Sequence, residues 1–191
     1  MEDTATCIVA IVKDGIITMG CDSAASNSES LKLNIREDKK IFVRNKEKQK
    51  WIFGFTTSYR MGQLIQYSLE LPTYDEKMDL HEFMVTSFIP ALRTCFQNGG
   101  YESKEKDRVS GGCFIVGFWK KLFVIHPNYQ VATSIQNFVS VGCGEQTALG
   151  ALSALKKVEK KISASKAVTI ALEAAEQYSA GVRGPFHLLS I

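Results

Sequence analysis

The feature that most constrains the fold is a pair of apolar segments near the start of the chain, residues 6–12 and 16–21. Lys13, Asp14 and Gly15 separate them, and an Asp-Gly pair between apolar runs is a strong signal for a tight β-hairpin turn. Each segment is apolar at successive positions and not at alternate ones, so both faces of each strand should be covered. We therefore expect this hairpin to lie inside a layered structure.

The rest of the chain alternates predicted strands with pairs of predicted helices. The expected strands are residues 41–44, 51–55, 113–119, 122–126, 129–133, 138–142 and 186–191. The first two expected helices are residues 58–71 and residues 80–97. Two more are expected near the C-terminus, one with an apolar face at Ala148, Leu149, Leu152 and Leu155, the other with an apolar face at Val168, Ala171, Leu172, Ala175 and Tyr178. Pro90 is expected to kink the second helix, and residues 98–112 are expected to form a loop.

These strands arrive in hairpins and not in strand–helix–strand units. Two sheets packed together, with the helix pairs on their outer faces, would cover both sides of each apolar strand. The pattern therefore predicts a layered α+β structure. A length of 191 residues suits one domain, residues 1–191.

Composition excludes several classes of function. Lysine and arginine total 23 against 20 acidic residues, and the two signs are interspersed, so nucleic-acid binding is not indicated. No apolar run is long enough to span a bilayer, and the acidic first residues are unlike a signal peptide, so a cytoplasmic location is expected. Five cysteines without a CxxC pair favour reduced thiols. Metal motifs and phosphate-binding loops are absent, so no metal and no cofactor is predicted.

Four segments, found in order along the chain, carry a resemblance to a known family. They read TCIVAIVKDGIITMGCDSAAS from Thr6, DKKIFV from Asp38, VGCGEQTALGAL from Val141 and EQYSAGVRGPFHL from Glu176. Together they resemble proteasome β-type subunits and the peptidase subunit of the bacterial ATP-dependent proteasome-like protease. The resemblance implies the Ntn-hydrolase fold, a four-layer αββα sandwich of two antiparallel sheets between helix pairs. It also implies a threonine-type endopeptidase that acts on polypeptides in a homo-oligomeric ring, with an ATPase unfoldase as partner.

The same resemblance implies a catalytic group of three residues. Thr6 takes the place of the N-terminal nucleophile, and Asp22 and Lys40 take the places of the acid and the lysine beside it. A threonine hydroxyl needs a base within hydrogen-bond reach, and in this class the base is the freed α-amine of the same residue. Such an amine has a pKa of about 7.7–8.0, so a substantial neutral fraction exists near neutral pH. A lysine ammonium nearby would lower the pKa of both the hydroxyl and the amine.

Further site residues follow from the resemblance, some of them with a changed residue type. Cys143 stands where the family has serine, Glu176 stands where it has aspartate, and Ser179 matches a serine. The expected substrate-binding residues are Ser26, Thr57 and Ser58, the last two at the place of a Gly-Gly pair that forms the oxyanion hole.

Three alternatives remain open at this level. Residues 1–5 precede Thr6, so the amine exists only if the Ala5–Thr6 bond is cut and the short propeptide is removed. If the bond stays intact, the chain would be an inactive subunit that acts as an assembly or scaffold module. A third reading is an Ntn amidase acting on a small amide. Cys7 is a rival nucleophile, but neighbouring residues of a strand face opposite ways, which disfavours it.

Overall fold

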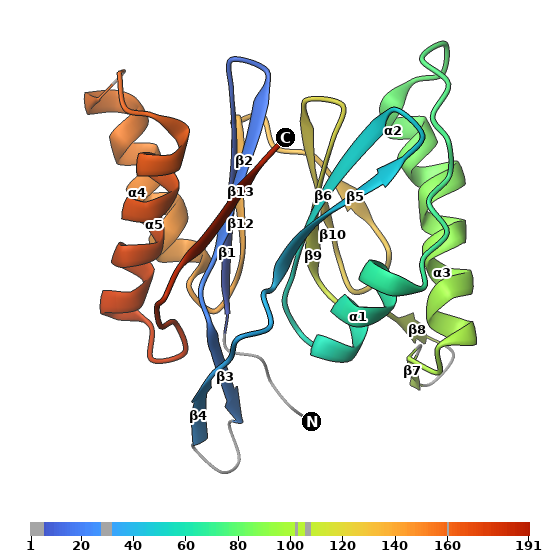
Figure 1. Ribbon diagram of the computed structural model, residues 1–191, viewed down its shortest axis with the longest axis horizontal. Helices are drawn as coiled ribbons and strands as arrows, with labels where there is room; N and C mark the ends of the chain where they lie inside the picture. Colours follow the sequence, from blue (N-terminus) through green and yellow to red (C-terminus); the bar gives the residue numbers. More distant parts are fainter. Residues whose placement is uncertain (1–5, 28–31, 102, 106–107, 160) are drawn as a thin grey trace.

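Two antiparallel sheets lie face to face, and each carries helices on its outer side (Figure 1). The computed structural model describes residues 6–27, 32–101, 103–105, 108–159 and 161–191. The layers follow one another in the order helices, sheet, sheet, helices, and this order confirms the expected αββα sandwich. Residues 1–5, the expected propeptide, lie outside the described residues.

The first sheet has four strands, and the opening hairpin forms its centre. Its order is β12 (Phe138–Gly142), β1 (Cys7–Lys13), β2 (Ile16–Cys21) and β13 (His187–Ser190). Asp14 and Gly15 have φ values of 52° and 76°, the two left-handed residues of a type I′ turn, as their sequence predicts. Helices α4 (Glu145–Val158) and α5 (Ala164–Tyr178) cover the outer face of this sheet.

The second sheet has five strands and is covered by the remaining helices. Its order is β11 (Val131–Ala132), β10 (Lys121–Ile125), β9 (Phe114–Phe118), β6 (Gln49–Phe55) and β5 (Ile41–Lys46). The covering segments are α1 (Tyr59–Tyr67), α2 (Leu80–Phe83), the π-helical segment η1 (Met84–Phe88) and α3 (Ile89–Asn98). The segment η1 runs directly into α3, and Pro90 lies in the first turn of α3. The helical segment is therefore π-helical just before the position where the sequence predicted a kink.

Two short hairpins depart from the sequence-based expectation. Strands β3 (Ala24–Asn27) and β4 (Lys32–Ile35) pair with each other, and the expected loop at residues 98–112 contains the pair β7 (Ser103–Glu105) and β8 (Arg108–Ser110). These strands are short and rich in residue types that are depleted in sheets, so the apolar pattern does not reveal them.

The packing between the layers holds β1 and β2 in place. Branched aliphatic side chains such as Ile8, Ile52 and Ile115 fill the space between the sheets. On the far side of the five-stranded sheet the core is aromatic, with the rings of Trp51 and Phe118 stacked at a centroid distance of 3.6 Å. On the other face of the central hairpin, Val9 packs with Val168 and Leu172 of α5, so both faces of the hairpin are covered, as expected.

Candidate active site

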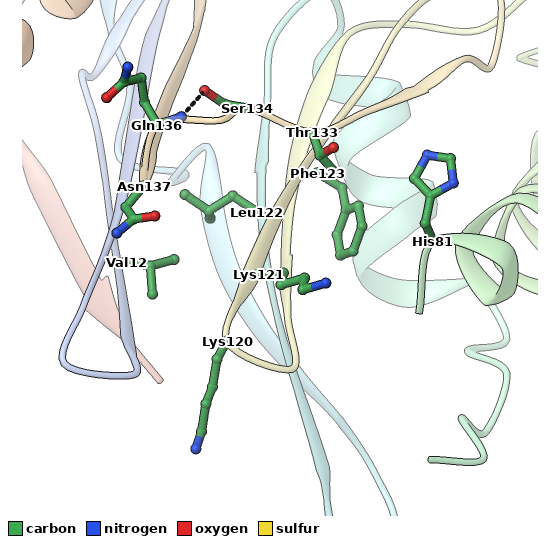
Figure 2. A pocket seen from close by; sticks show the side chains of 10 residues that line it. All are labelled: Val12, His81, Lys120, Lys121, Leu122, Phe123, Thr133, Ser134, Gln136 and Asn137. Carbon is green, nitrogen blue, oxygen red and sulfur yellow. Dashed lines mark hydrogen bonds between the residues drawn. The ribbon is translucent and has the colours of Figure 1, made fainter. Parts of the chain in front are cut away.

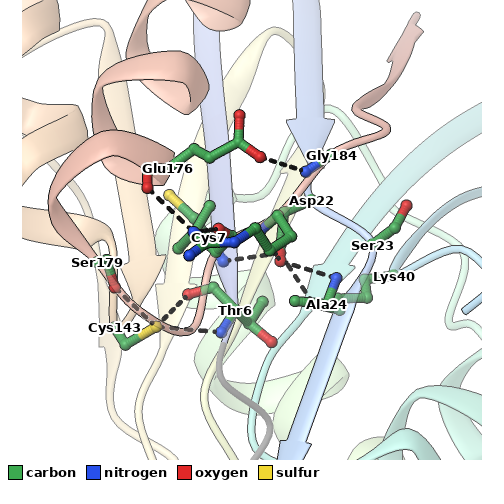
Figure 3. Close-up of polar contacts among 12 residues, drawn as sticks. Thr6, Cys7, Asp22, Ser23, Ala24, Lys40, Cys143, Glu176, Ser179 and Gly184 are labelled. Atoms are coloured by element: carbon green, nitrogen blue, oxygen red, sulfur yellow. Dashed lines mark hydrogen bonds and ion pairs between the residues drawn. The ribbon is translucent and has the colours of Figure 1, made fainter. Parts of the chain in front are cut away.

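A buried ion pair forms the centre of the site (Figure 3). Lys40 Nζ donates to Asp22 Oδ1 at 2.8 Å, and the side chains of Lys40 and Asp22 are 1% and 0% exposed. Asp22 follows β2 and Lys40 precedes β5, so one residue comes from each sheet. The same oxygen, Oδ1, accepts from the Cys7 amide at 2.9 Å. The carboxylate therefore links the lysine to the peptide unit that follows Thr6.

The second carboxylate oxygen of Asp22 is held by backbone amides. Asp22 Oδ2 accepts from Ala24 N at 3.0 Å and from Arg183 N at 3.4 Å. The Ser23 amide donates to Arg183 O at 2.9 Å, and its hydroxyl donates to Pro185 O at 2.6 Å. These bonds fix the position of the Asp22 carboxylate beside Lys40.

Thr6 and Cys143 contact each other across the edge of the four-stranded sheet. The Thr6 backbone nitrogen donates to Cys143 Sγ at 3.3 Å, and the thiol is also 3.4 Å from Thr6 O. Ser179 at the end of α5 donates its hydroxyl hydrogen to the same sulfur at 3.3 Å. Thr6 is buried, whereas Cys143 is exposed. The structure thus brings together three residues that are far apart in the sequence, around the nitrogen of Thr6.

Glu176 supports the loop that follows α5. Its carboxylate oxygen Oε1 accepts from Gly184 N at 2.9 Å, and its carbonyl oxygen accepts from Arg183 Nη1 at 3.1 Å. The Arg183 guanidinium also donates to Val182 O at 2.7 Å. Glu176 therefore contributes to the site through the segment that holds Asp22. Sequence reasoning missed Arg183 and Ser23, because the Arg183 amide that holds Asp22 and the Ser23 amide that holds Arg183 O are backbone groups. The acceptors of both side chains are backbone carbonyls distant from them or local to a loop, which no residue type signals.

Cys7 packs on the side of β1 that faces the helices. Its sulfur lies 3.8 Å from Ser140 Oγ, and burial raises the pKa of the Cys7 thiol to about 12. A thiol with such a pKa stays protonated near neutral pH and is a poor nucleophile. The geometry and the pKa both disfavour Cys7 as the attacking group.

The segment after β6 has an unusual backbone at the place of the expected oxyanion hole. Thr57 has a φ of 67°, and Ser58 N donates to Thr56 O at 2.7 Å, which closes a γ-turn around Thr57. The Thr57 hydroxyl accepts from Cys113 N at 3.1 Å. Ser58 Oγ caps helix α1 by accepting from the amides at positions 60 and 61. Ser26 lies on β3, and its side chain is outside the described part of the structure.

Two substitutions at Thr57 should separate backbone strain from hydrogen bonding. A left-handed backbone costs a residue with a Cβ about 1–2 kcal/mol, and valine keeps this strain while removing the hydroxyl acceptor. Thr57→Val should therefore lower the free energy of unfolding by about 1 kcal/mol. Thr57→Gly loses the hydroxyl but relieves the strain, so it should stay within about 0.5 kcal/mol of the wild type. Urea unfolding measures both, and a glycine variant less stable than the valine variant would contradict this account.

Two features are absent from the described ranges. No group of three or more His, Cys, Asp or Glu residues is placed there to hold a metal ion. No helix in the same ranges combines the length and the apolar character that crossing a membrane requires.

The two stacked sheets between helix layers are the fold of the proteasome-like Ntn-hydrolases. No family model and no curated protein matches the sequence. Among solved structures, BPH from Thiobacillus denitrificans is similar at a TM-score of 0.76 and 17% identity, covering 97% of each chain. HslV from Trypanosoma brucei has a TM-score of 0.66 at 17% identity, covering 97% of this chain and 98% of that one. The Anbu complex from Pseudomonas aeruginosa is described as a helical assembly. It is similar at a TM-score of 0.68 and 13% identity, and the match covers 97% of this chain and 81% of the Anbu chain.

Proposed function

We propose that this chain is a threonine-type endopeptidase of the N-terminal-nucleophile class, which becomes active when Thr6 is exposed as the first residue. The observation that carries the proposal is the shared carboxylate oxygen of Asp22. It accepts both from the buried Lys40 ammonium, at 2.8 Å, and from the amide that follows Thr6, at 2.9 Å. The Asp22 carboxylate thereby links a buried cation to the peptide unit that follows the proposed nucleophile.

In the proposed reaction, the Thr6 hydroxyl attacks the carbonyl carbon of a peptide bond. The freed Thr6 amine takes the hydroxyl proton and gives it to the leaving amine, and water then hydrolyses the acyl ester. The amine would occupy the place of the present Thr6 nitrogen, where Cys143 Sγ lies at 3.3 Å and is itself bonded by Ser179. These two residues would orient the base, and Lys40 would lower the pKa of the hydroxyl.

The oxyanion requires a backbone donor, and the γ-turn at Thr57 engages an amide at the place that the resemblance assigns to the oxyanion hole. Ser58 N donates to Thr56 O at 2.7 Å. In the active form, we expect this segment to turn so that an amide points toward the substrate carbonyl. The free-energy cost of such a change is small, because the strained φ of Thr57 already raises the energy of the present conformation.

We also propose that the active form is a homo-oligomer in the cytoplasm. The fold is shared with the Anbu complex from Pseudomonas aeruginosa, which is described as a helical assembly. A closed ring that receives unfolded polypeptides from an ATPase unfoldase is the arrangement that the sequence resemblance implies. Light scattering coupled to size-exclusion chromatography distinguishes a ring from an open helix and from a monomer.

Intact-mass spectrometry combined with a peptidase assay tests the proposed reaction. The active protein should lack residues 1–5, and fluorogenic peptides should be turned over. Thr6→Ala should reduce kcat by about 10⁴-fold or more, because the attacking atom is lost. Thr6→Ser retains a hydroxyl and is the matched control, which should keep part of the activity. A processed protein whose Thr6→Ala variant retains full activity would refute the assignment of Thr6.

A second candidate function is an unprocessed, inactive subunit that acts as an assembly or scaffold module. The engagement of Ser58 N with Thr56 O favours it, since this amide is then closed to a substrate oxyanion. An intact Met1, no turnover and a homogeneous oligomer would together support this candidate over the peptidase. Turnover of small amides in place of peptides would instead indicate an Ntn amidase.

A further inference from the structure

An apolar cavity of about 260 Å³ lies between the four-stranded sheet and the helices that cover it. Its apolar side chains belong to the core cluster on the helix side of this sheet and are Ile11, Phe138, Leu152, Leu155, Ile162 and Ala167. They therefore face one common space, around which Ile11, Leu155 and Ile162 are only partly buried. An apolar cavity of about 150 Å³ is large enough for benzene, so a short alkyl chain fits this one.

One face of α4 forms a wall of the cavity. Leu152, Leu155, Lys156 and Glu159 line it, and steps of three or four residues place them on the same side of the helix. The first two are apolar and the last two are charged. The wall therefore changes from apolar to charged toward the C-terminal end of α4.

Lys156 places a cation beside the apolar floor. Its Nζ lies 6.0 Å from the centroid of the Phe138 ring and donates to Gln136 Oε1 at 2.7 Å. This acceptor is neutral, and within the described part of the chain Lys156 forms no ion pair. Glu159, the acid in the same wall, accepts from Lys161 N at 3.2 Å through Oε1. An anionic head could therefore replace the neutral amide as the partner of Lys156.

The segment before β12 supplies the acceptor of Lys156 from the sheet layer (Figure 2). Gln136 N donates to Ser134 Oγ at 3.0 Å, and Val12 N donates to Asn137 O at 2.7 Å. Val12 and Asn137 line both this cavity and the pocket drawn in Figure 2, and the Val12 side chain packs between the sheets. The backbone of β1 and of this segment thus separates the two spaces.

Lys13 borders the cavity at the connection between α4 and α5. It lies on the same side of β1 as Ile11, because alternate residues of a strand face the same way. Its Nζ donates to Ile162 O at 2.5 Å, which ties β1 to this connection. A second positive charge with a neutral acceptor therefore lines the same cavity.

We propose that this cavity binds a small amphiphile with one anionic head, of the class of medium-chain carboxylates. Its head lies at Lys156 and its alkyl chain lies against Phe138, Leu152 and Leu155. Such a ligand contacts the sheet and α4 together and stabilises the folded state as its concentration rises. The proposal is independent of the proposed peptidase reaction.

Titration calorimetry and thermal unfolding with four probes test the cavity. The probes are octanoate, neutral octanol, octylammonium and acetate, each kept below the concentration at which it forms micelles. Octanoate should bind saturably and raise the Tm. Octanol should bind about tenfold more weakly, because the charge-assisted hydrogen bond is missing. Octylammonium should also bind more weakly than octanoate, and acetate should not bind. Octanoate that does not saturate, or that binds no more tightly than octanol or octylammonium, would overturn the proposal.

Four variants separate the roles of the head and the chain. Lys156→Met should weaken octanoate binding about tenfold and leave octanol binding unchanged. Glu159→Gln should tighten octanoate binding, because a like charge is removed from the wall. Leu155→Trp fills the cavity from a partly exposed position and should abolish binding of both probes. Lys157→Met is the matched control, since Lys157 is exposed and does not line the cavity. Equal octanoate affinity in the Lys156 and Lys157 variants would refute the site.

Discussion

Lys40→Met should lower the free energy of unfolding by about 3–5 kcal/mol, because it leaves the Asp22 carboxylate buried without its cation. Both side chains are almost fully inaccessible to water, so solvent cannot replace the lost interaction. Methionine keeps most of the length of the lysine side chain, and the cavity contribution is therefore small. Chemical denaturation followed by circular dichroism measures the change. Peptidase activity, if present in the wild type, should be lost as well.

A neighbouring lysine and a double variant are the controls for this prediction. Lys39 is exposed, so Lys39→Met should change the free energy of unfolding by no more than about 0.5 kcal/mol. The double variant with Lys40→Met and Asp22→Asn removes both charges and should be more stable than Lys40→Met alone by about 1 kcal/mol or more. A Lys40→Met variant as stable as the Lys39→Met variant would show that the ion pair does not hold the site together.

Gly142→Ala should cause the second large effect, a loss of about 3 kcal/mol in stability together with distortion of the site. Gly142 has a φ of 104°, a conformation that residues with a Cβ rarely adopt. A Cβ at this position would overlap the Thr6 carbonyl oxygen and would lie 2.8 Å from the Thr6 carbonyl carbon. Both are backbone atoms, so β1 and β12 would have to separate where Thr6 is held.

A second glycine provides a matched control with the opposite expected sign. Gly150 lies on the exposed side of α4, and a Cβ there would meet nothing within 4 Å. Because alanine favours the helix over glycine, Gly150→Ala should raise the free energy of unfolding by about 0.5–1 kcal/mol. Thermal unfolding of both variants tests the pair. A Gly142→Ala variant with wild-type stability would mean that the strand ends can move apart at little cost.

Local patterns were sufficient for the layers of the fold. The Asp14-Gly15 turn, the continuous apolar strands and the apolar faces of α4 and α5 are properties of neighbouring residues, and the structure has these elements where they were expected. The hairpins β3–β4 and β7–β8 were missed because their strands are only three or four residues long and are rich in residue types that are depleted in sheets. The π-helical segment before Pro90 could not be read from helix periodicity, since over its five residues it differs from an α-helix only in hydrogen bonds that span i to i+5 in place of i to i+4.

For the candidate site, too, residue types indicated some features and only the structure showed others. Residue types and their order along the chain pointed to Thr6, Asp22 and Lys40, together with Cys143, Glu176 and Ser179, through resemblance to a family. The contacts of Glu176 with Gly184 and the γ-turn at Thr57 carry no signal in residue type. The γ-turn depends on backbone groups alone, and the Glu176 carboxylate finds its donor in the Gly184 backbone amide, which almost any residue type at position 184 would supply.

The sequence alone determined that the chain forms two covered antiparallel sheets and that a threonine heads the first of their strands, because turn chemistry and apolar periodicity act over a few residues. Only the tertiary structure decided that Lys40 meets Asp22 across the two sheets and that Arg183, 161 positions along the chain from Asp22, donates to the same carboxylate. The physical reason is that burial and electrostatic pairing depend on distances in space, which the packing of the two sheets sets.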